Sequence, residues 1–187
     1  VDISEKNIKE PQTRAISGCR EKGIDPKTYY PFPTSWILSN VNSMSEKLEK
    51  DFFDIVVYTS SIEHMNKEDG ALSLAEIAKV IKKSGKLFLS CPNTPEDKDG
   101  FDTQYAAHVY EWKLSELREE LTKNGFRIKS EFGLIVNKRI LDEKLKDNPT
   151  YKKIAEYIPT EFLTCFAGIP FPELSKEVFL ICEKGES

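Results

Sequence analysis

The chain has 187 residues, of which 31% are charged and 39% hydrophobic, a composition typical of one soluble globular domain with a sizeable core. Its formal net charge is −4, which disfavours a protein that binds nucleic-acid phosphates in general. No apolar run approaches the length of a membrane span, and the first residues lack the apolar segment of a signal peptide. The four cysteines form no Cys-x-x-Cys pair, so we expect reduced thiols and a cytoplasmic location.

The first third of the chain contains weak helix and strand signals. Val1–Ser4 has the pattern of the end of a strand, and a helix is expected from Glu10 to about Lys22, with a proline in its first turn. A proline-rich loop over residues 25–35 precedes a short strand over 35–41. A surface helix is then expected over 43–50.

The middle of the chain gives the clearest pattern. An apolar strand beginning at Phe53 runs into a polar loop at Thr59, and apolar residues then recur at helical spacing between Leu72 and Ile81. Gly85 is expected to end this helix before a strand at Leu87–Leu89. Strand, crossover helix and strand in this order predict parallel pairing.

The last part of the chain adds a helix and two strands. A long polar loop over 91–110 precedes an amphipathic helix over Leu114–Leu121 and a strand over Phe126–Val136. Residues 137–176 contain four prolines and several aromatic residues, and we expect them to form a cover or lid inserted within a single domain of residues 1–187. A buried strand, Val178–Cys182, closes the chain.

The alternation of strands and helices predicts a doubly wound α/β fold. In such folds ligands bind beyond the carboxyl ends of the strands. Asp2, Asn42, Thr59–His64 and Pro92–His108 all fall at that end in the expected arrangement. The sequence therefore predicts a binding site there.

Four short motifs occur in an order and spacing that resemble the middle of a class I S-adenosylmethionine-dependent methyltransferase. They are Phe53-Asp54-Ile55-Val56-Val57, Glu63-His64, Lys83-Ser84-Gly85 and Ser90-Cys91-Pro92-Asn93. The resemblance extends over nearly the whole chain. It implies a Rossmann-like sheet with a terminal antiparallel hairpin, S-adenosylmethionine as cofactor, and methyl transfer to an oxygen or nitrogen of a small-molecule or sugar-like acceptor.

The resemblance also implies a set of cofactor-binding residues. Asp2 matches the acid that accepts hydrogen bonds from the ribose hydroxyls, and Ile3 would pack on the adenine; read alone, Asp2 would be a turn or helix-capping residue. Asn40 or Asn42, with Ser43, stands near the position of the acid that lies beside the adenine amino group. The residues expected at the methionine end of the cofactor are Tyr58, Thr59 and Ser60.

The glycine-rich loop of the family has no counterpart in this sequence. It should lie about 20 residues before the ribose acid, which places it upstream of Val1. The first strand of the family's sheet is missing with it. We therefore expect at least about forty further N-terminal residues in the natural protein, or another element in that place; without either, the chain lacks its cofactor cradle.

The chemistry is expected to depend on the only two histidines, which both lie in predicted loops. His108 is the candidate base or substrate orienter, with Glu63 and His64 as further catalytic candidates. A structural histidine packed on Trp112, and a Glu63-His64 pair that only fixes its loop, are equally open interpretations. A polar pocket at Asn93, Tyr105 and Trp112 is expected to hold the acceptor.

Two alternatives remain open. A methyltransferase-like subunit that has lost catalysis and binds a partner would also lack the glycine loop. Glu63-His64 and His108 are in addition similar to the metal-assisted RNA 3′-terminal 2′-O-methyltransferases, but Ser60 stands where those have a first glutamate, and no metal site is predicted. The expected partners are a small-molecule acceptor and, as an open possibility, a second copy of the chain, with no membrane.

Overall fold

The computed structural model describes residues 4–6, 9, 21–23, 35, 37–103 and 105–185. The chain divides into two compact units, 1–49 and 50–187. Asp2, Ile3 and most of the predicted helix Glu10–Lys22 lie outside the described residues. Asn42 and Ser43, two of the predicted cofactor-binding residues, belong to the first unit.

In the first unit, a 3-10 helix, η1, spans Val41–Glu46. The Asn40 side chain caps it by accepting a hydrogen bond from the Asn42 amide at 3.0 Å. The predicted strand therefore cannot extend to Val41, because the Asn40 cap starts a helical turn there. This turn begins two residues before Ser43, where the sequence predicted the surface helix to start.

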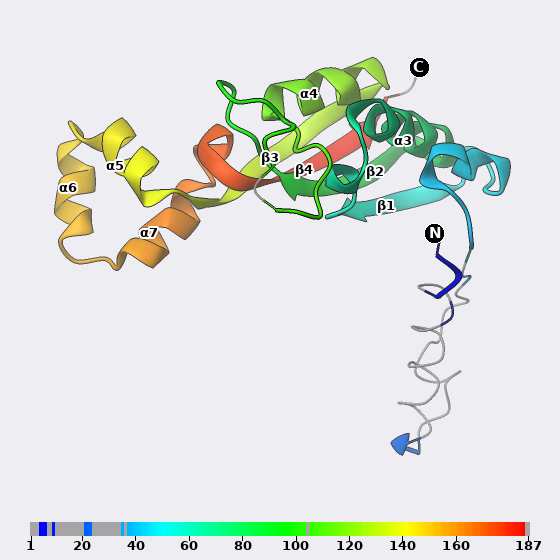
Figure 1. The fold of residues 1–187 in the computed structure, drawn as a ribbon, viewed down its shortest axis with the longest axis horizontal. Helices are drawn as coiled ribbons and strands as arrows, with labels where there is room; N and C mark the ends of the chain where they lie inside the picture. Colours follow the sequence, from blue (N-terminus) through cyan, green and yellow to red (C-terminus); the bar gives the residue numbers. More distant parts are fainter. Residues whose placement is uncertain are drawn as a thin grey trace. The chain divides into compact units, whose positions relative to one another are not determined.

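The second unit contains a four-stranded sheet of order β1-β2-β4-β3 (Figure 1). Strands β1 (Phe53–Thr59) and β2 (Ile81–Pro92) are parallel. Strand β4 (Ser175–Lys184) is antiparallel to both β2 and β3 (Phe126–Val136). The α/β class and the terminal antiparallel hairpin are thus confirmed.

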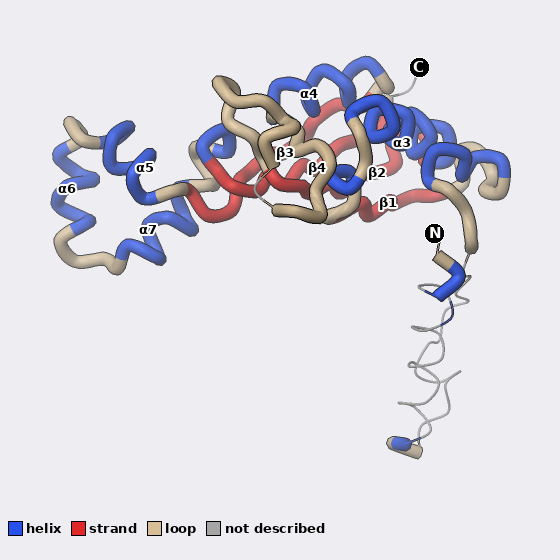
Figure 2. Tube along the Cα trace, viewed as in Figure 1, coloured by secondary structure: helices blue, strands red, loops and turns tan. Residues whose placement is uncertain are grey.

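Two helices cover one face of the sheet, α3 (Lys67–Val80) and α4 (Leu114–Lys123) (Figure 2). Apolar side chains of both helices and of the strands beneath them form the core, and the fully buried ones include Leu74, Ile77, Leu87, Leu89, Leu117, Leu121 and Leu180. Burying them supplies the main driving force for this layer. On the opposite face, β1 leaves Ile55 and Val57 57% and 67% exposed.

Gly85 does not end helix α3, contrary to the sequence prediction. The helix ends at Val80, and Ile81 is already extended. Gly85 lies inside β2, where the pairing with β1 shifts register, and a Cβ there would come within 2.8 Å of the Ile81 side chain. The glycine is required by this close approach of the backbone to a neighbouring side chain.

Residues 138–174 form three short helices and a 3-10 turn beyond the end of the sheet where β3 ends and β4 begins (Figure 1). They are α5 (Lys138–Leu145), α6 (Pro149–Ala155), α7 (Thr160–Ala167) and η3 (Pro172–Leu174). Val136, Leu141 and Ala167 make a small core of their own there. The role of this segment as a lid stays a prediction. No described helix is long and apolar enough to cross a membrane.

Candidate functional site

Two loops meet at the carboxyl end of the parallel strand pair. The 3-10 turn η2 (Ile62–His64) follows β1, and residues 93–113 connect β2 to α4. The backbone amides of Val109 and Tyr110 both donate to the Glu63 carbonyl, at 2.8 and 3.3 Å. These two hydrogen bonds fix the second loop against the first.

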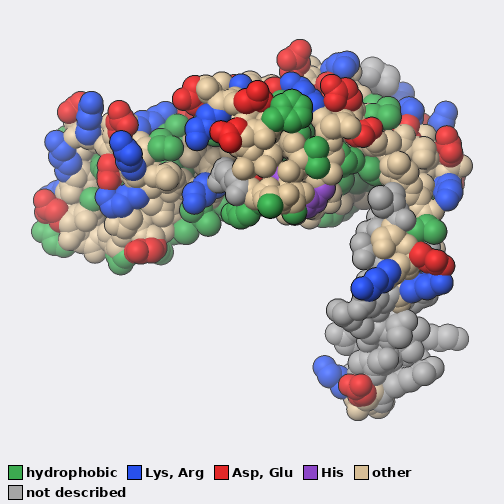
Figure 3. All heavy atoms as spheres, in the orientation of Figure 1, with side chains coloured by type: hydrophobic (Ala, Val, Ile, Leu, Met, Phe, Trp, Pro, Cys, Tyr) green, Lys and Arg blue, Asp and Glu red, His purple; other side chains and the backbone are tan. Residues whose placement is uncertain are grey.

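This contact brings the three predicted catalytic residues together. One ligand-type atom from each of Glu63, His64 and His108 lies within 4.8 Å of the other two. The two imidazole rings meet edge to face, with centroids 5.2 Å apart. Histidine side chains are visible on the surface of the sheet-containing unit in Figure 3, among hydrophobic neighbours.

Hydrogen bonds set the tautomer of both histidines. His64 Nδ1 lies 2.9 Å from the Ala107 carbonyl oxygen, which can only accept, so Nδ1 carries the proton. His108 Nδ1 lies 2.7 Å from Oε1 of Glu111, a carboxylate that is 1% exposed. In its neutral form, each ring therefore presents an unprotonated Nε2.

Sequence reasoning missed Glu111. It follows His108 by three residues, and an acid at that distance from a loop histidine is the signal that could have identified it. Its carboxylate holds the orientation of the His108 ring in the way that second carboxylates orient catalytic and metal-binding histidines.

Glu63 is the buried acid of the site. The residue is 2% exposed, and its Oε2 has no hydrogen-bond partner among the described residues. Burial raises the pKa of its carboxyl, while the nearby His64 and His108 act to lower it. A buried oxygen without a partner is rare in native proteins and calls for a ligand, an ion or water.

The residues predicted to hold the methionine end of the cofactor lie at the end of β1. Tyr58 points towards α3, where its hydroxyl lies 3.0 Å from Ser73 Oγ, and burial raises its pKa to about 12. Thr59 and Ser60 are exposed. Ser60 has a left-handed backbone (φ 47°), a strained conformation for a residue with a side chain, and its amide donates to the Ser90 carbonyl.

The three predicted acceptor-binding residues differ in exposure. Tyr105 is 60% exposed, and its ring lies 5.0 Å from that of His108. Trp112 is 1% exposed and meets the Tyr110 ring edge to face. Of the three, Tyr105 is thus the one whose exposed ring stands beside a candidate catalytic group.

Asn93 is 2% exposed, and every polar atom of its side chain is engaged within the protein. Its amide nitrogen donates to the carbonyls of Glu173 and Ser175, and its oxygen accepts from the Leu114 amide. The side chain thus ties the end of β2 to the start of α4 and to the start of β4. A contact between Asn93 and the acceptor stays a prediction.

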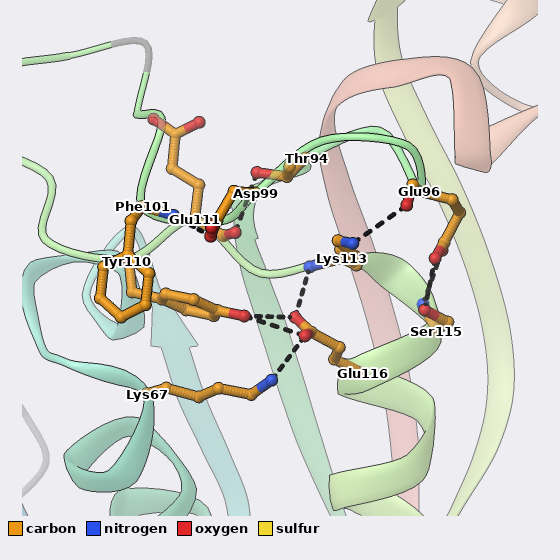
Figure 4. A network of polar contacts seen from close by, with 10 residues as sticks. All are labelled: Lys67, Thr94, Glu96, Asp99, Phe101, Tyr110, Glu111, Lys113, Ser115 and Glu116. Atoms are coloured by element: carbon orange, nitrogen blue, oxygen red, sulfur yellow. Dashed lines mark hydrogen bonds and ion pairs between the residues drawn. The ribbon is translucent and has the colours of Figure 1, made fainter.

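A second polar cluster, which sequence reasoning also missed, surrounds the start of α4 (Figure 4). Glu116 accepts hydrogen bonds from the Tyr110 hydroxyl, Lys67 Nζ and the Lys113 amide at 2.9, 2.5 and 3.1 Å. Burial acts to raise the pKa of Glu116, but these bonds outweigh it and hold the pKa below its usual value. The cluster lines a pocket of about 420 Å³ and fixes Tyr110, the residue two places after His108.

Residues 1–89 match a family model described as a methyltransferase domain. No curated protein matches the sequence.

Similar solved structures include the YcgJ protein from Bacillus subtilis, which is 17% identical, with a TM-score of 0.57 over 99% of this chain and 81% of that one. A SAM-dependent methyltransferase from Archaeoglobus fulgidus is 17% identical, with a TM-score of 0.53 over 90% and 80%. The 1,6-didemethyltoxoflavin-N1-methyltransferase of Burkholderia thailandensis, solved with its substrate and S-adenosylhomocysteine, is 13% identical, with a TM-score of 0.50 over 87% and 59%. At these identities the likeness shows a shared fold. Together with the match of residues 1–89 to a methyltransferase domain, this shared fold confirms the predicted resemblance to class I methyltransferases.

Proposed function

We propose that this chain transfers a methyl group to an oxygen or nitrogen of a small-molecule or sugar-like acceptor. It has the fold of a class I S-adenosylmethionine-dependent methyltransferase, and its residues 1–89 match a methyltransferase domain. One observation carries the proposal. Glu63, His64 and His108 converge beside the end of β1, at the sheet edge where ligands of α/β folds bind.

The chemistry requires positioning above all. The acceptor atom attacks the methyl carbon of the sulfonium in line, the new bond to carbon forms as the carbon–sulfur bond breaks, and S-adenosylhomocysteine leaves. His108 Nε2 is free to take the proton that the acceptor hydroxyl or ammonium loses. Glu111 holds the imidazole in the required tautomer and offsets the charge that develops on the ring.

The resemblance suggests where the cofactor binds. Thr59 and Ser60, exposed at the end of β1, would face its methionine part together with Tyr58. Asp2, Ile3, Asn42 and Ser43 would serve the ribose and adenine. A related structure with bound S-adenosylhomocysteine supports this cofactor.

The acceptor class follows from charge and surface. A net charge of −4 and an exposed Tyr105 ring beside His108 suit a small molecule better than a nucleic acid. The Burkholderia relative is a 1,6-didemethyltoxoflavin-N1-methyltransferase that was solved with 1,6-didemethyltoxoflavin bound. Cys91, Cys165 and Cys182 are free thiols, which agrees with the proposed cytoplasmic location.

The test is methyl transfer from labelled S-adenosylmethionine by the full-length protein to a panel of hydroxyl- and amine-bearing small molecules. With an acceptor identified, His108→Gln should lower kcat by about 10²- to 10⁴-fold, the usual contribution of a general base, and leave cofactor affinity unchanged. Glu68→Gln, an exposed acid at the start of α3, is the matched control and should behave as the wild type.

Two results would contradict the proposed methyl transfer, and a third would contradict the role of His108. Cofactor binding without transfer to any acceptor, or no cofactor binding by a well-folded protein, would favour a non-catalytic binding subunit. An unchanged kcat in His108→Gln would remove His108 as the base.

A further inference from the structure

We propose that the pocket at the start of α4 binds a small organic anion that carries an aromatic ring, such as an aryl phosphate or an aryl carboxylate. The inference goes beyond the proposed function, because the pocket shares no lining residue with the group of Glu63, His64 and His108. Its test needs neither the cofactor nor a methyl acceptor, so each proposal can fail alone.

The pocket has the size of a small-molecule site. Its volume of about 420 Å³ lies within the range of pockets that hold small ligands. The start of α3, residues 98–101 of the loop after β2, and the start of α4 together with Tyr110 form its walls. Three segments that are separate in sequence thus meet around one hollow.

The pocket carries an excess of positive charge, although the net charge of the chain is −4. Three lysines and two acids line it. Both acids are already engaged within the protein. Glu116 accepts a hydrogen bond from Lys67 Nζ at 2.5 Å, and Asp99 accepts one from the backbone amide two residues later at 3.1 Å. Neither carboxylate therefore needs the remaining two lysines.

These two lysines have no carboxylate partner among the described residues. Lys98 Nζ makes no hydrogen bond or ion pair there, and Lys113 Nζ donates to the backbone carbonyl of Glu96 at 3.0 Å. The Glu96 carboxylate points instead to Ser115, whose Oγ lies 2.7 Å away (Figure 4). An ammonium group has three donor hydrogens, so both lysines keep donors for an anion.

Aromatic side chains form the apolar wall of the pocket. The Phe101 residue is 63% exposed, and its ring meets the Tyr110 ring edge to face, with centroids 5.0 Å apart. A Cβ at Gly100 would come within 2.6 Å of the Tyr110 ring, so this glycine permits the close approach of the loop. An exposed ring beside two unpaired ammonium groups suits a flat ligand with negative charge.

The pocket is placed for a second ligand rather than for the methyl acceptor. Figure 4 shows the Glu111 carboxylate, which holds His108, directed away from the Tyr110 hydroxyl that faces the pocket. The Gly100 carbonyl accepts a hydrogen bond from the Glu111 amide at 2.8 Å. A ligand in the pocket would therefore contact the loop that presents His108 without occupying the position of the acceptor.

The test is a titration of ¹⁵N-labelled full-length protein with phenyl phosphate, followed in ¹H–¹⁵N spectra with assigned amides. We expect saturable shifts centred on the amides of Gly100, Phe101 and Tyr110, with a dissociation constant of about 1 mM or lower. Inorganic phosphate lacks the ring and phenol lacks the charge, so each should bind at least about tenfold more weakly. Added salt should weaken the binding of phenyl phosphate, because it screens the two lysines.

Two variants each remove one feature of the pocket. Lys98→Met keeps most of the side-chain length without the charge, and Phe101→Ala removes the exposed ring. Each should weaken the binding of phenyl phosphate by about 3- to 10-fold, the size expected for one exposed ion pair or one ring contact. The matched control is Lys152→Met, which replaces an exposed lysine of α6 and should bind as the wild type. The same spectra show whether each variant is folded.

Four results would overturn the inference. The first two are the absence of saturable shifts in the folded wild type and shifts centred on residues outside the pocket. The third is wild-type affinity in either folded variant, Lys98→Met or Phe101→Ala. The fourth is binding of inorganic phosphate or phenol as tight as that of phenyl phosphate, which would refute an aromatic anion as the ligand.

Discussion

The Glu63 carboxylate is nearly inaccessible to solvent, and one of its oxygens has no hydrogen-bond donor among the described residues. Burial raises its pKa above the usual value of 4.5, so the folded protein holds this proton more tightly than the unfolded chain does. Between the two pKa values the folded state binds more protons. The free energy of unfolding contributed by this group therefore falls as pH rises from about 4.5 through the folded pKa.

Replacing Glu63 by Gln should remove this contribution. Glu63→Gln should be more stable than the wild type at neutral pH, and the difference should vanish as pH falls below 4.5. Urea denaturation at a series of pH values measures it, with Glu68→Gln as the control. A variant that is less stable than the wild type at neutral pH would show that the charged carboxylate has a favourable partner in the folded protein.

The buried side-chain amide of Asn93 joins three segments by hydrogen bonds, and a substitution can test how much these bonds stabilise the fold. In Asn93→Asp, a carboxylate oxygen would replace the NH₂ group that faces the carbonyls of Glu173 and Ser175 at 3.2 and 3.0 Å. Two hydrogen bonds would become repulsive contacts, and the free energy of unfolding should fall by at least about 2 kcal/mol. The matched control is Asn148→Asp, because an aspartate caps α6 as well as an asparagine does. Equal stability of the two variants in urea would refute this role.

At the scale of elements, most of the second unit could be predicted from periodicity. Strand β3 was expected over the residues it occupies, and α3 and α4 follow from apolar residues at helical spacing. The errors occur where tertiary contacts override local signals. A glycine in the sequence context of Gly85 is typical of a helix end. In the structure it lies instead in β2, where the pairing with β1 shifts register and Ile81 and β1 lie close to its backbone.

The docking of α7 on β3 depends on two glycines that the sequence did not reveal as a pair. The Gly133 amide donates to the Gly168 carbonyl at 2.8 Å, and a Cβ at Gly168 would overlap the Gly133 carbonyl. Gly168→Ala should therefore cost about 1–3 kcal/mol of unfolding free energy. Ala155→Ser, exposed in α6, should stay within about 0.5 kcal/mol. Equal melting temperatures for the two variants would contradict this account of the contact.

For the sheet-containing unit as a whole, stability should be uneven. Strands β2 and β4 lie between other strands and contribute fully buried residues such as Leu87, Leu89 and Leu180. Helix α6 has no buried residue, and α5 and α7 have few. Backbone amides of β2 and β4 should therefore exchange with solvent most slowly, and those of α6 much faster. Hydrogen exchange by mass spectrometry measures this, and equal protection of α6 and β4 would contradict it.

The site was predictable only in part. Histidines in loops after parallel strands indicate a ligand-binding edge, which is why Glu63, His64 and His108 could be proposed together. Glu111 and the unpartnered Oε2 of Glu63 depend on how two loops far apart in sequence pack. No local pattern encodes such packing, so the tautomers of His64 and His108 and the burial of the Glu63 carboxyl group are known only from the structure.

Calorimetric titration of S-adenosylmethionine and S-adenosylhomocysteine into the full-length protein tests the central claim most directly. The account predicts micromolar binding of both, because the fold and the domain match are those of methyltransferases that use this cofactor. The absence of binding by the folded protein would contradict the methyltransferase function and remove Asp2 as a cofactor ligand.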